Sequence, residues 1–330
     1  MRRLTLLFAG CLLAGVWSCQ KPGSNKPEAS TKPAASAATR PTIAVIPKGT
    51  THVFWKSVEA GAKRAGEELN VEIIWKGPLK ENDRAQQIQV VQQFISQGVA
   101  GIALAPLDSK ALIAPVLAAK AKGIPVVIFD SGLDADPGKD FVSFVATNNV
   151  EGGRLGGQEL AELLGGQGDV VLLRYMVGSA STTNREQGFL EAIKKYADIK
   201  ITVDNRYAGA TAGEAKTQAL NLIDQLRTAR GIFCPNESST LGMLLALQQE
   251  GLAGKVRFVG FDASPPLVKA LTAGEIDALV VQNPRKMGYT AVKTLVQHLH
   301  GEPVDTVIDT GVVLVTRDNM NQPEIQRLIE

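Results

Sequence analysis

The stretch GIPVVIFDSG, residues 123–132, places a short apolar run directly before polar turn residues. Residues 125–129 are apolar without alternation, which is typical of a strand buried on both faces of a parallel sheet. Gly123 supplies a stop for a helix predicted over 109–122. Asp130 follows the run with no helical residue between, so we expect its carboxylate at the carboxyl edge of a buried sheet.

Runs of the same kind recur through the chain, with helical segments between them. The strands predicted in the first half are 42–46, 71–75, 101–105, 125–129 and 141–145; those in the second half are 169–175, 200–203, 231–234, 256–261 and 276–281. In the helix predicted over 84–97, Ile88, Val91 and Ile95 share one face. Two successive βα series predict an α/β protein with two doubly wound parallel-sheet lobes.

Polar residues gather directly after several of these strands. They are Pro47-Lys48-Gly49, Asp130-Ser131-Gly132, Thr147-Asn148-Asn149, Asn236-Glu237 and Asp262-Ala263-Ser264. A ligand site in a doubly wound sheet lies at the carboxyl ends of the strands. We therefore expect a ligand in the cleft between the two lobes.

The N-terminal segment has the order of an export signal. Arg2 and Arg3 precede an apolar stretch over 4–17, which is too short to span a bilayer, and Cys19 follows. The segment resembles a lipoprotein signal over 1–19, with Cys19 as the lipidated residue and anchor to the membrane. Lipidation at Cys11 and an unlipidated secreted form are the alternatives.

Residues 20–40, rich in Pro, Ala, Ser and Lys, contain no large apolar side chain. This composition predicts a disordered tether, or alternatively a tail without a role of its own.

The whole chain is 45% hydrophobic and 21% charged with a net charge of +2, so no basic excess indicates a nucleic-acid partner. About 290 residues remain after the tether, enough for two lobes. Cys234 has no partner for a disulfide there and is expected to be a small buried residue.

Seven segments in order carry a specific resemblance. They are IAVIP with VFWKSVEAGAKRAGEELNVEI, GIPVVIFDSG, ATNNVEGGRLGG, NREQGFLEAI, IFCPNESSTLGMLLAL, VGFDASP and VVQNPRKMGYTAV. From about residue 42 to the C-terminus the chain resembles the type I periplasmic sugar-binding proteins of the ribose- and galactose-binding group.

The resemblance implies a three-crossing hinge between the lobes. One lobe is expected over 41–147 plus 283–310, the other over 148–282 plus 311–330. Hinge closure would bury a solute and present a surface to a partner. The implied role is that of a periplasmic or cell-envelope solute-binding protein, expected to be a monomer, of an ABC importer with its permease and ATPase. A sensory receptor for a histidine kinase or a chemoreceptor is the alternative.

Sugar capture needs planar hydrogen-bonding groups around the ring edge and aromatic rings against its C–H faces. Carried over from the resemblance, the aromatic contacts are Phe54 and Trp55, and His52 stands where the family often has Asn. The hydrogen-bonding contacts implied in the same way are Asp130, Arg185, Asn236, Asp262 and Gln282.

Each of these residues has a structural alternative. Phe54 and Trp55 could form the core face of their helix, and the two aspartates could be caps or turn residues. Arg185 could lie on the surface, Asn236 could cap the helix that follows it, and Gln282 could pack in the hinge without touching a ligand.

Departures from the family pattern leave the solute open among a pentose, a hexose, a cyclitol and a furanose-like signal molecule. Ala105 replaces a polar residue of ribose-binding members, and Ser131 stands where they often have Arg. Ala210 falls where a further aromatic ring would stack, and Tyr207 is a candidate to replace that ring.

Enzymatic and repressor functions are disfavoured by the motifs. The glycine cluster 165–168 precedes a strand, whereas a dinucleotide-binding loop follows one. No GxxxxGK[ST] loop, no metal-spaced histidine pair and no Ser/His/Asp arrangement stands out, so no cofactor and no metal is expected. Repressors of the lac type share this fold but begin with a helix-turn-helix, where this chain has the export signal and tether.

Overall fold

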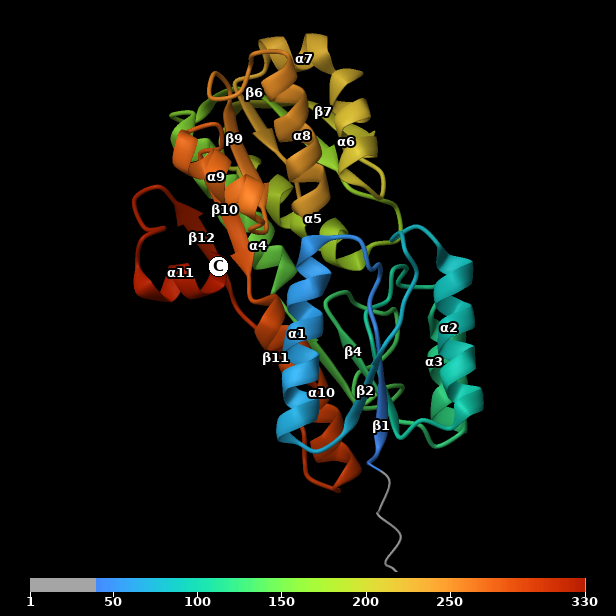
Figure 1. The fold of residues 1–330 in the computed structure, drawn as a ribbon. Coiled ribbons are helices and arrows are strands. Elements are labelled where there is room, and N and C mark those ends of the chain that lie inside the picture. Colours follow the sequence, from blue (N-terminus) through green and yellow to red (C-terminus); the bar gives the residue numbers. More distant parts are fainter. Residues whose placement is uncertain (1–39, 330) are drawn as a thin grey trace, which may run out of the picture. The chain divides into compact units, whose positions relative to one another are not determined.

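The computed structural model describes residues 40–329, which form two six-stranded sheets covered by helices (Figure 1). The first sheet has the order β11-β5-β4-β3-β1-β2 and all its pairs are parallel. Its strands are β1 (Thr42–Ile46), β2 (Glu72–Trp75), β3 (Gly101–Leu104), β4 (Val126–Phe129), β5 (Ser143–Ala146) and β11 (Val307–Asp309).

The second sheet repeats this plan in the order β12-β10-β9-β8-β6-β7. Its strands are β6 (Gln167–Arg174), β7 (Asp198–Tyr207), β8 (Gly231–Phe233), β9 (Arg257–Phe261), β10 (Ala278–Gln282) and β12 (Val312–Thr316). The β10 and β12 strands pair antiparallel, and the other pairs are parallel. We call the elements around the first sheet the N lobe and those around the second the C lobe.

Strand residues alternate between two apolar layers in each lobe, as expected for sheets buried on both faces. In the N lobe, α1 and α10 lie on one side of the sheet and α2 and α3 on the other (Figure 1). Ile43 and Val45 pack toward α1 and α10, whereas Ala44 and Ile46 pack toward α2 and α3. These helices are α1 (Val53–Glu68), α2 (Arg84–Gln97), α3 (Ile113–Ala121) and α10 (Pro284–Leu299). The predicted fold class, with two doubly wound sheets, is confirmed.

The C lobe is layered in the same way. One face of its sheet packs on α4 and α5, and the other packs on α6 to α9 and α11. The helices are α4 (Asn149–Leu163), α5 (Ala180–Ile193), α6 (Ala212–Leu220), α7 (Ile223–Thr228), α8 (Glu237–Gln249), α9 (Pro265–Ala273) and α11 (Pro323–Ile329).

The chain passes between the lobes three times, from β5 to α4, from β10 to α10 and from β11 to β12. Two of the three connections are tied together by the Thr147 hydroxyl, which donates to Gln282 Oε1 at 2.8 Å. The Asn148 N–H donates to Asp309 Oδ1 at 3.2 Å. The residue-level lobe boundaries given above fall at these connections and stay a prediction.

Several sequence expectations differ from the structure at element ends. Strand β7 extends from Asp198 to Tyr207, well beyond the predicted 200–203. The strands β11 and β12 were not predicted. The β11 strand has three residues, two of them exposed, whereas β12 begins with four apolar residues that were not assigned to a strand. The expected export signal over 1–19, its Cys19 and the tether up to residue 39 lie outside the described residues.

Between residues 40 and 329 no helix has both the length and the apolar character that crossing a bilayer requires. Over the same residues no cluster of three His, Cys, Asp or Glu side chains is arranged to hold a metal ion.

Candidate ligand-binding site

A cavity of about 310 Å³ lies between the lobes at the carboxyl ends of both sheets. All eight residues predicted from the sequence line it: His52, Phe54, Trp55, Asp130, Arg185, Asn236, Asp262 and Gln282. Six further lining residues were not predicted: Lys48, Glu81, Tyr175, Ser181, Thr182 and Glu237. Because both lobes contribute, the cavity is complete only when they face each other.

Asp130 and Asp262 occupy equivalent places in the two lobes. Asp130 follows β4 and Asp262 follows β9, and both have the left-handed backbone, with φ of 62° and 69°. Each backbone N–H bonds to the strand alongside, Asp130 to Val145 O at 3.0 Å and Asp262 to Val280 O at 2.8 Å. This backbone is costly for residues other than Gly and Asn and is found preferentially at functional sites.

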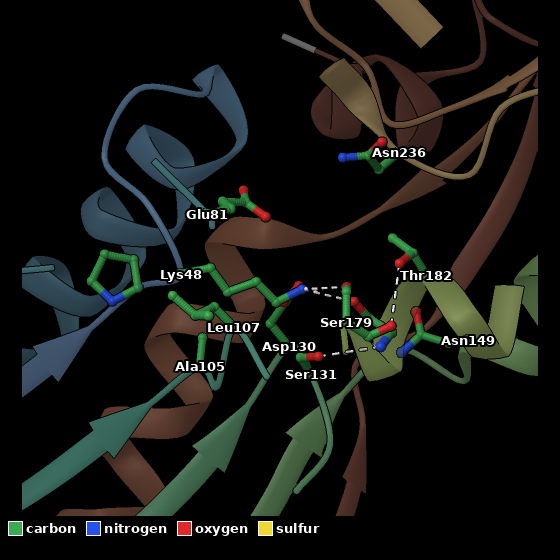
Figure 2. Close-up of polar contacts among 12 residues, drawn as sticks. Lys48, Glu81, Ala105, Leu107, Asp130, Ser131, Asn149, Ser179, Thr182 and Asn236 are labelled. Carbon is green, nitrogen blue, oxygen red and sulfur yellow. Dashed lines mark hydrogen bonds and ion pairs between the residues drawn. The ribbon is translucent and has the colours of Figure 1, made fainter. Parts of the chain in front are cut away.

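Lys48 links the lobes at one side of the cavity (Figure 2). Its ammonium lies 3.2 Å from Asp130 Oδ2 in the N lobe. It also donates across the cleft to the hydroxyls of Ser179 at 3.3 Å and Ser181 at 2.9 Å. Ser131 adds a parallel link, since its hydroxyl accepts from the Ser181 N–H at 3.2 Å.

Glu81 is the centre of a second buried network. His52 Nδ1 lies 2.9 Å and Trp55 Nε1 2.7 Å from Glu81 Oε1, within the N lobe. From the C lobe, the Tyr175 hydroxyl donates to Glu81 Oε2 at 3.0 Å. His52 Nε2 lies 3.0 Å from Ala210 O, also in the C lobe. Both imidazole nitrogens therefore face acceptors, an arrangement that only the protonated ring satisfies.

The charges of this network reinforce one another. Burial alone lowers the pKa of His52, but the charge and the hydrogen bond of Glu81 outweigh it and raise the pKa to about 9. Burial likewise opposes ionisation of Glu81, yet His52, Lys48 and the Trp55 N–H bring its pKa down to about 2. Burial and the nearby Glu81 raise the pKa of Tyr175 well above its usual value. We infer an ion pair between His52 and Glu81 at neutral pH.

Arg185 is a buried residue and not a surface arginine. Its Nε donates to Asn149 Oδ1 at 2.8 Å and its Nη1 to Pro235 O at 3.0 Å. The guanidinium carbon lies 3.9 Å from the centroid of the Phe261 ring, which supports it as a cation–π partner. Burial lowers the pKa of Arg185, while Asp262 and Asp130 act in the opposite sense.

Asp262 and its neighbours form the hinge side of the cavity. Gln282 Nε2 donates to Asp262 Oδ1 at 2.7 Å, and the Glu237 N–H donates to Oδ2 at 3.0 Å. Gln282 thus has the hinge-packing contacts of its structural alternative as well as a place on the cavity wall. Asn236 also has both features, because its side chain caps α8 through the Ser239 N–H at 3.2 Å.

Two aromatic side chains from α1 border the cavity in different ways. Trp55 is only 2% exposed and belongs to the N-lobe core, with its ring edge-on to Phe129. Phe54 is half-buried and lies at right angles to Trp55, with 5.0 Å between ring centroids. Tyr207 is 43% exposed and is not among the lining residues, so its suggested role as a replacement ring is wrong.

Four of the six lining residues that were not predicted differ in the sequence signal they carry. Lys48 and Glu237 stand in strand-end clusters that were recognised as polar, whereas Tyr175 was placed inside the predicted strand 169–175, which ends at Arg174 in the structure. The position after a strand was thus a usable signal. Glu81 lies in an irregular segment between β2 and α2, where nothing in the sequence indicates that it folds back into the cleft.

The site can hold a compact, hydroxyl-rich solute. It offers fixed carboxylate, amide, guanidinium and ammonium groups around the edge and the Phe54 and Trp55 rings on one side. Such groups bind ring hydroxyls as paired donors and acceptors, and aromatic rings cover apolar C–H faces.

Comparisons with known proteins agree with this geometry. A model of the periplasmic binding protein domain matches residues 43–303. The D-allose-binding periplasmic protein of Escherichia coli is 33% identical over 259 residues, covering 77% of this chain and 83% of the relative.

Solved structures are similar over most of the chain. A carbohydrate transporter solute-binding protein from Agrobacterium radiobacter, in complex with D-arabinose, has a TM-score of 0.84 and 36% identity. The alignment covers 89% of this chain and 100% of that one. An ABC transporter solute-binding protein from Agrobacterium vitis with bound D-fucose has the same TM-score at 34% identity, covering 88% and 100%.

Proposed function

The chain belongs to the family of the periplasmic binding protein domain, and from this premise we propose that it captures a monosaccharide or a related solute for an ABC importer. The observation that carries the proposal is the cavity closed by both lobes, with equivalent aspartates at Asp130 and Asp262. D-allose, D-arabinose and D-fucose, named with the similar proteins, are all aldoses of one ring and are the first solutes to test.

The mechanism follows from the cross-lobe contacts. Lys48 and Glu81 extend from the N lobe and bond to Ser181 and Tyr175 of the C lobe. A solute that bonds to both lobes adds to these contacts and stabilises the closed form, which presents both lobes together to the permease. The buried charged groups act by binding and orienting hydroxyls, and the protein is proposed to be a carrier and not an enzyme.

The cellular setting is part of the same proposal. An exported, periplasmic or envelope-bound carrier agrees with the family and with the signal-like order of Arg2, Arg3 and the apolar run before Cys19. We propose that Cys19 carries the lipid anchor and that residues 20–40 hold a monomeric carrier near the permease and its ATPase. Mass spectrometry of the mature N-terminus tests this, and an unmodified Cys19 would contradict it.

Calorimetric titration of the purified protein with D-allose, D-arabinose, D-fucose, D-ribose and myo-inositol tests solute capture. We expect at least one dissociation constant in the micromolar range or below. Asp262→Ala should weaken that binding by about 2 kcal/mol or more, because a buried ligand hydroxyl loses a charged acceptor. The exposed Asp318→Ala is the matched control. Folded protein that binds none of the five solutes would count against the proposal.

A further inference from the structure

The charged side chains of the cavity are mostly arranged as pairs. Lys48 lies 3.2 Å from Asp130, and His52 lies 2.9 Å from Glu81. Arg185 and Asp262 line the same cavity without a direct ion pair between them; burial lowers the pKa of Arg185, and the nearby Asp262, and after it Asp130 and Glu81, act to raise it. Three cations are thus matched in number by three carboxylates on the cavity wall.

Glu237 is a fourth carboxylate on the same wall. It is the first residue of α8, and its N–H is fixed by the bond to Asp262 Oδ2. The residue is only 5% exposed. Within residues 40–329 its carboxylate forms no ion pair, although it contacts the space that a ligand would occupy.

The surroundings of Glu237 disfavour its charge while the cavity has no ligand. Burial raises the pKa of Glu237, and the negative Asp262 and Glu81 act in the same direction. The charge of His52 opposes this, but it is already shared with Glu81. A buried carboxylate without a cation is costly, and a cation delivered by the ligand would remove that cost.

The position of Glu237 also leaves room for a substituent. A second hollow of about 700 Å³ adjoins the cavity on the hinge side, and Phe54, Glu237, Asp262 and Gln282 border both spaces. A group that projects from a sugar ring toward Glu237 therefore meets space and not a closed wall.

We propose that Glu237 is a specificity-determining residue and that the site prefers an amino sugar, whose ammonium pairs with the Glu237 carboxylate. This rests on the proposed function and narrows it to a class of solute. The three cations and their carboxylates orient ring hydroxyls, and the unmatched carboxylate selects the charged substituent. Charge-assisted hydrogen bonds are about twice as strong as neutral ones, so an ammonium should be favoured over a hydroxyl at this position.

The test compares amino sugars with their parent sugars by calorimetric titration of the purified protein at pH 7. The probes are D-glucosamine, D-galactosamine, D-mannosamine and 3-amino-3-deoxy-D-glucose, each beside its parent hexose and, where it exists, its N-acetyl derivative. We expect at least one amino sugar to bind tenfold or more tightly than both its parent and its N-acetyl form.

Substitution at Glu237 locates the preference. Glu237→Gln keeps the size of the side chain and should reduce the tenfold preference for the amino sugar to less than twofold. The exposed Glu67→Gln is the matched control and should keep the preference. The comparison in the unsubstituted protein decides the matter even if Glu237→Gln does not fold.

The outcomes separate this inference from the proposed function. Parent sugars that bind as tightly as every amino counterpart would overturn the role of Glu237 and leave sugar capture intact. An amino-sugar preference that survives in Glu237→Gln would also overturn it. Folded protein that binds neither kind of sugar would overturn both.

Discussion

Replacing Glu81 with glutamine removes the carboxylate on which side chains of both lobes converge. His52, Trp55 and Tyr175 all bond to it, at 2.9, 2.7 and 3.0 Å. The amide introduced by Glu81→Gln has one accepting oxygen and no charge, so it retains at most part of this network. We expect the free energy of unfolding to fall, and to fall by an amount that depends on pH.

The magnitude follows from the pKa of His52. Its rise from 6.5 to about 9 in the folded protein corresponds to about 3 kcal/mol, at about 1.4 kcal/mol for each tenfold change in proton affinity. Because the folded pKa is raised, this stabilisation is complete below pH 6.5 and is lost as the pH rises toward 9. The lowered pKa of Glu81 reflects the same interaction and is not added to it.

The assay is urea unfolding of the original protein and of Glu81→Gln at several pH values between 6 and 9.5. We expect Glu81→Gln to be about 3 kcal/mol less stable at pH 6, with the difference shrinking between pH 6.5 and 9 as His52 loses its proton in the original protein. Glu67→Gln should follow the original protein at every pH. Stability profiles of the original protein and Glu81→Gln that run parallel from pH 6.5 to 9 would refute the ion pair.

Two further substitutions probe how the lobes are held. Lys48→Met leaves Asp130 buried without its cation and should lower the free energy of unfolding by about 3 kcal/mol. Because a bond between the lobes is also lost, the radius of gyration measured by X-ray scattering without solute should increase. The control Lys56→Met, at an exposed position, should change neither quantity. Gly153→Ala places a Cβ 1.9 Å from the Arg185 carbonyl oxygen. This substitution should lower the free energy of unfolding by about 1–3 kcal/mol and weaken solute binding. Gly213→Ala, on open helix surface, should be neutral or stabilising. Solute affinity unchanged in Gly153→Ala would show that Arg185 is not positioned by the contact of α4 with α5.

The sheet layers were predictable because burial on both faces leaves a strong mark in the sequence. Runs such as 125–129 are apolar at every position, and the strand Val126–Phe129 lies within that run. The edge strand Val307–Asp309 has three residues, two of them exposed, so its composition carries no such mark, whereas Val312–Thr316 begins with four apolar residues and was recognisable. Their places depend on the third crossing between the lobes, which only the family resemblance indicated.

The candidate site was predictable where a functional side chain directly follows a strand. Asp130 and Asp262 were identified in this way, and the structure adds that both adopt the left-handed backbone. Glu81 was not predicted as a site residue because its position depends on tertiary contacts with Trp55 and Tyr175, which lie 26 and 94 residues away along the chain. A lone acidic residue in a polar segment is ordinarily solvated, and the sequence contains no sign of its burial.

The two lobes use equivalent strand ends for different tasks. Asp130 is paired with Lys48, whose other bonds reach Ser179 and Ser181, so the N-lobe aspartate is tied to contacts that join the lobes. Asp262 is instead held by Gln282 and by the N–H of Glu237, within the C lobe and next to the hinge. A solute that bonds to Asp130 therefore meets a group tied to the contacts between the lobes, whereas a solute that bonds to Asp262 meets a group held by bonds within the C lobe.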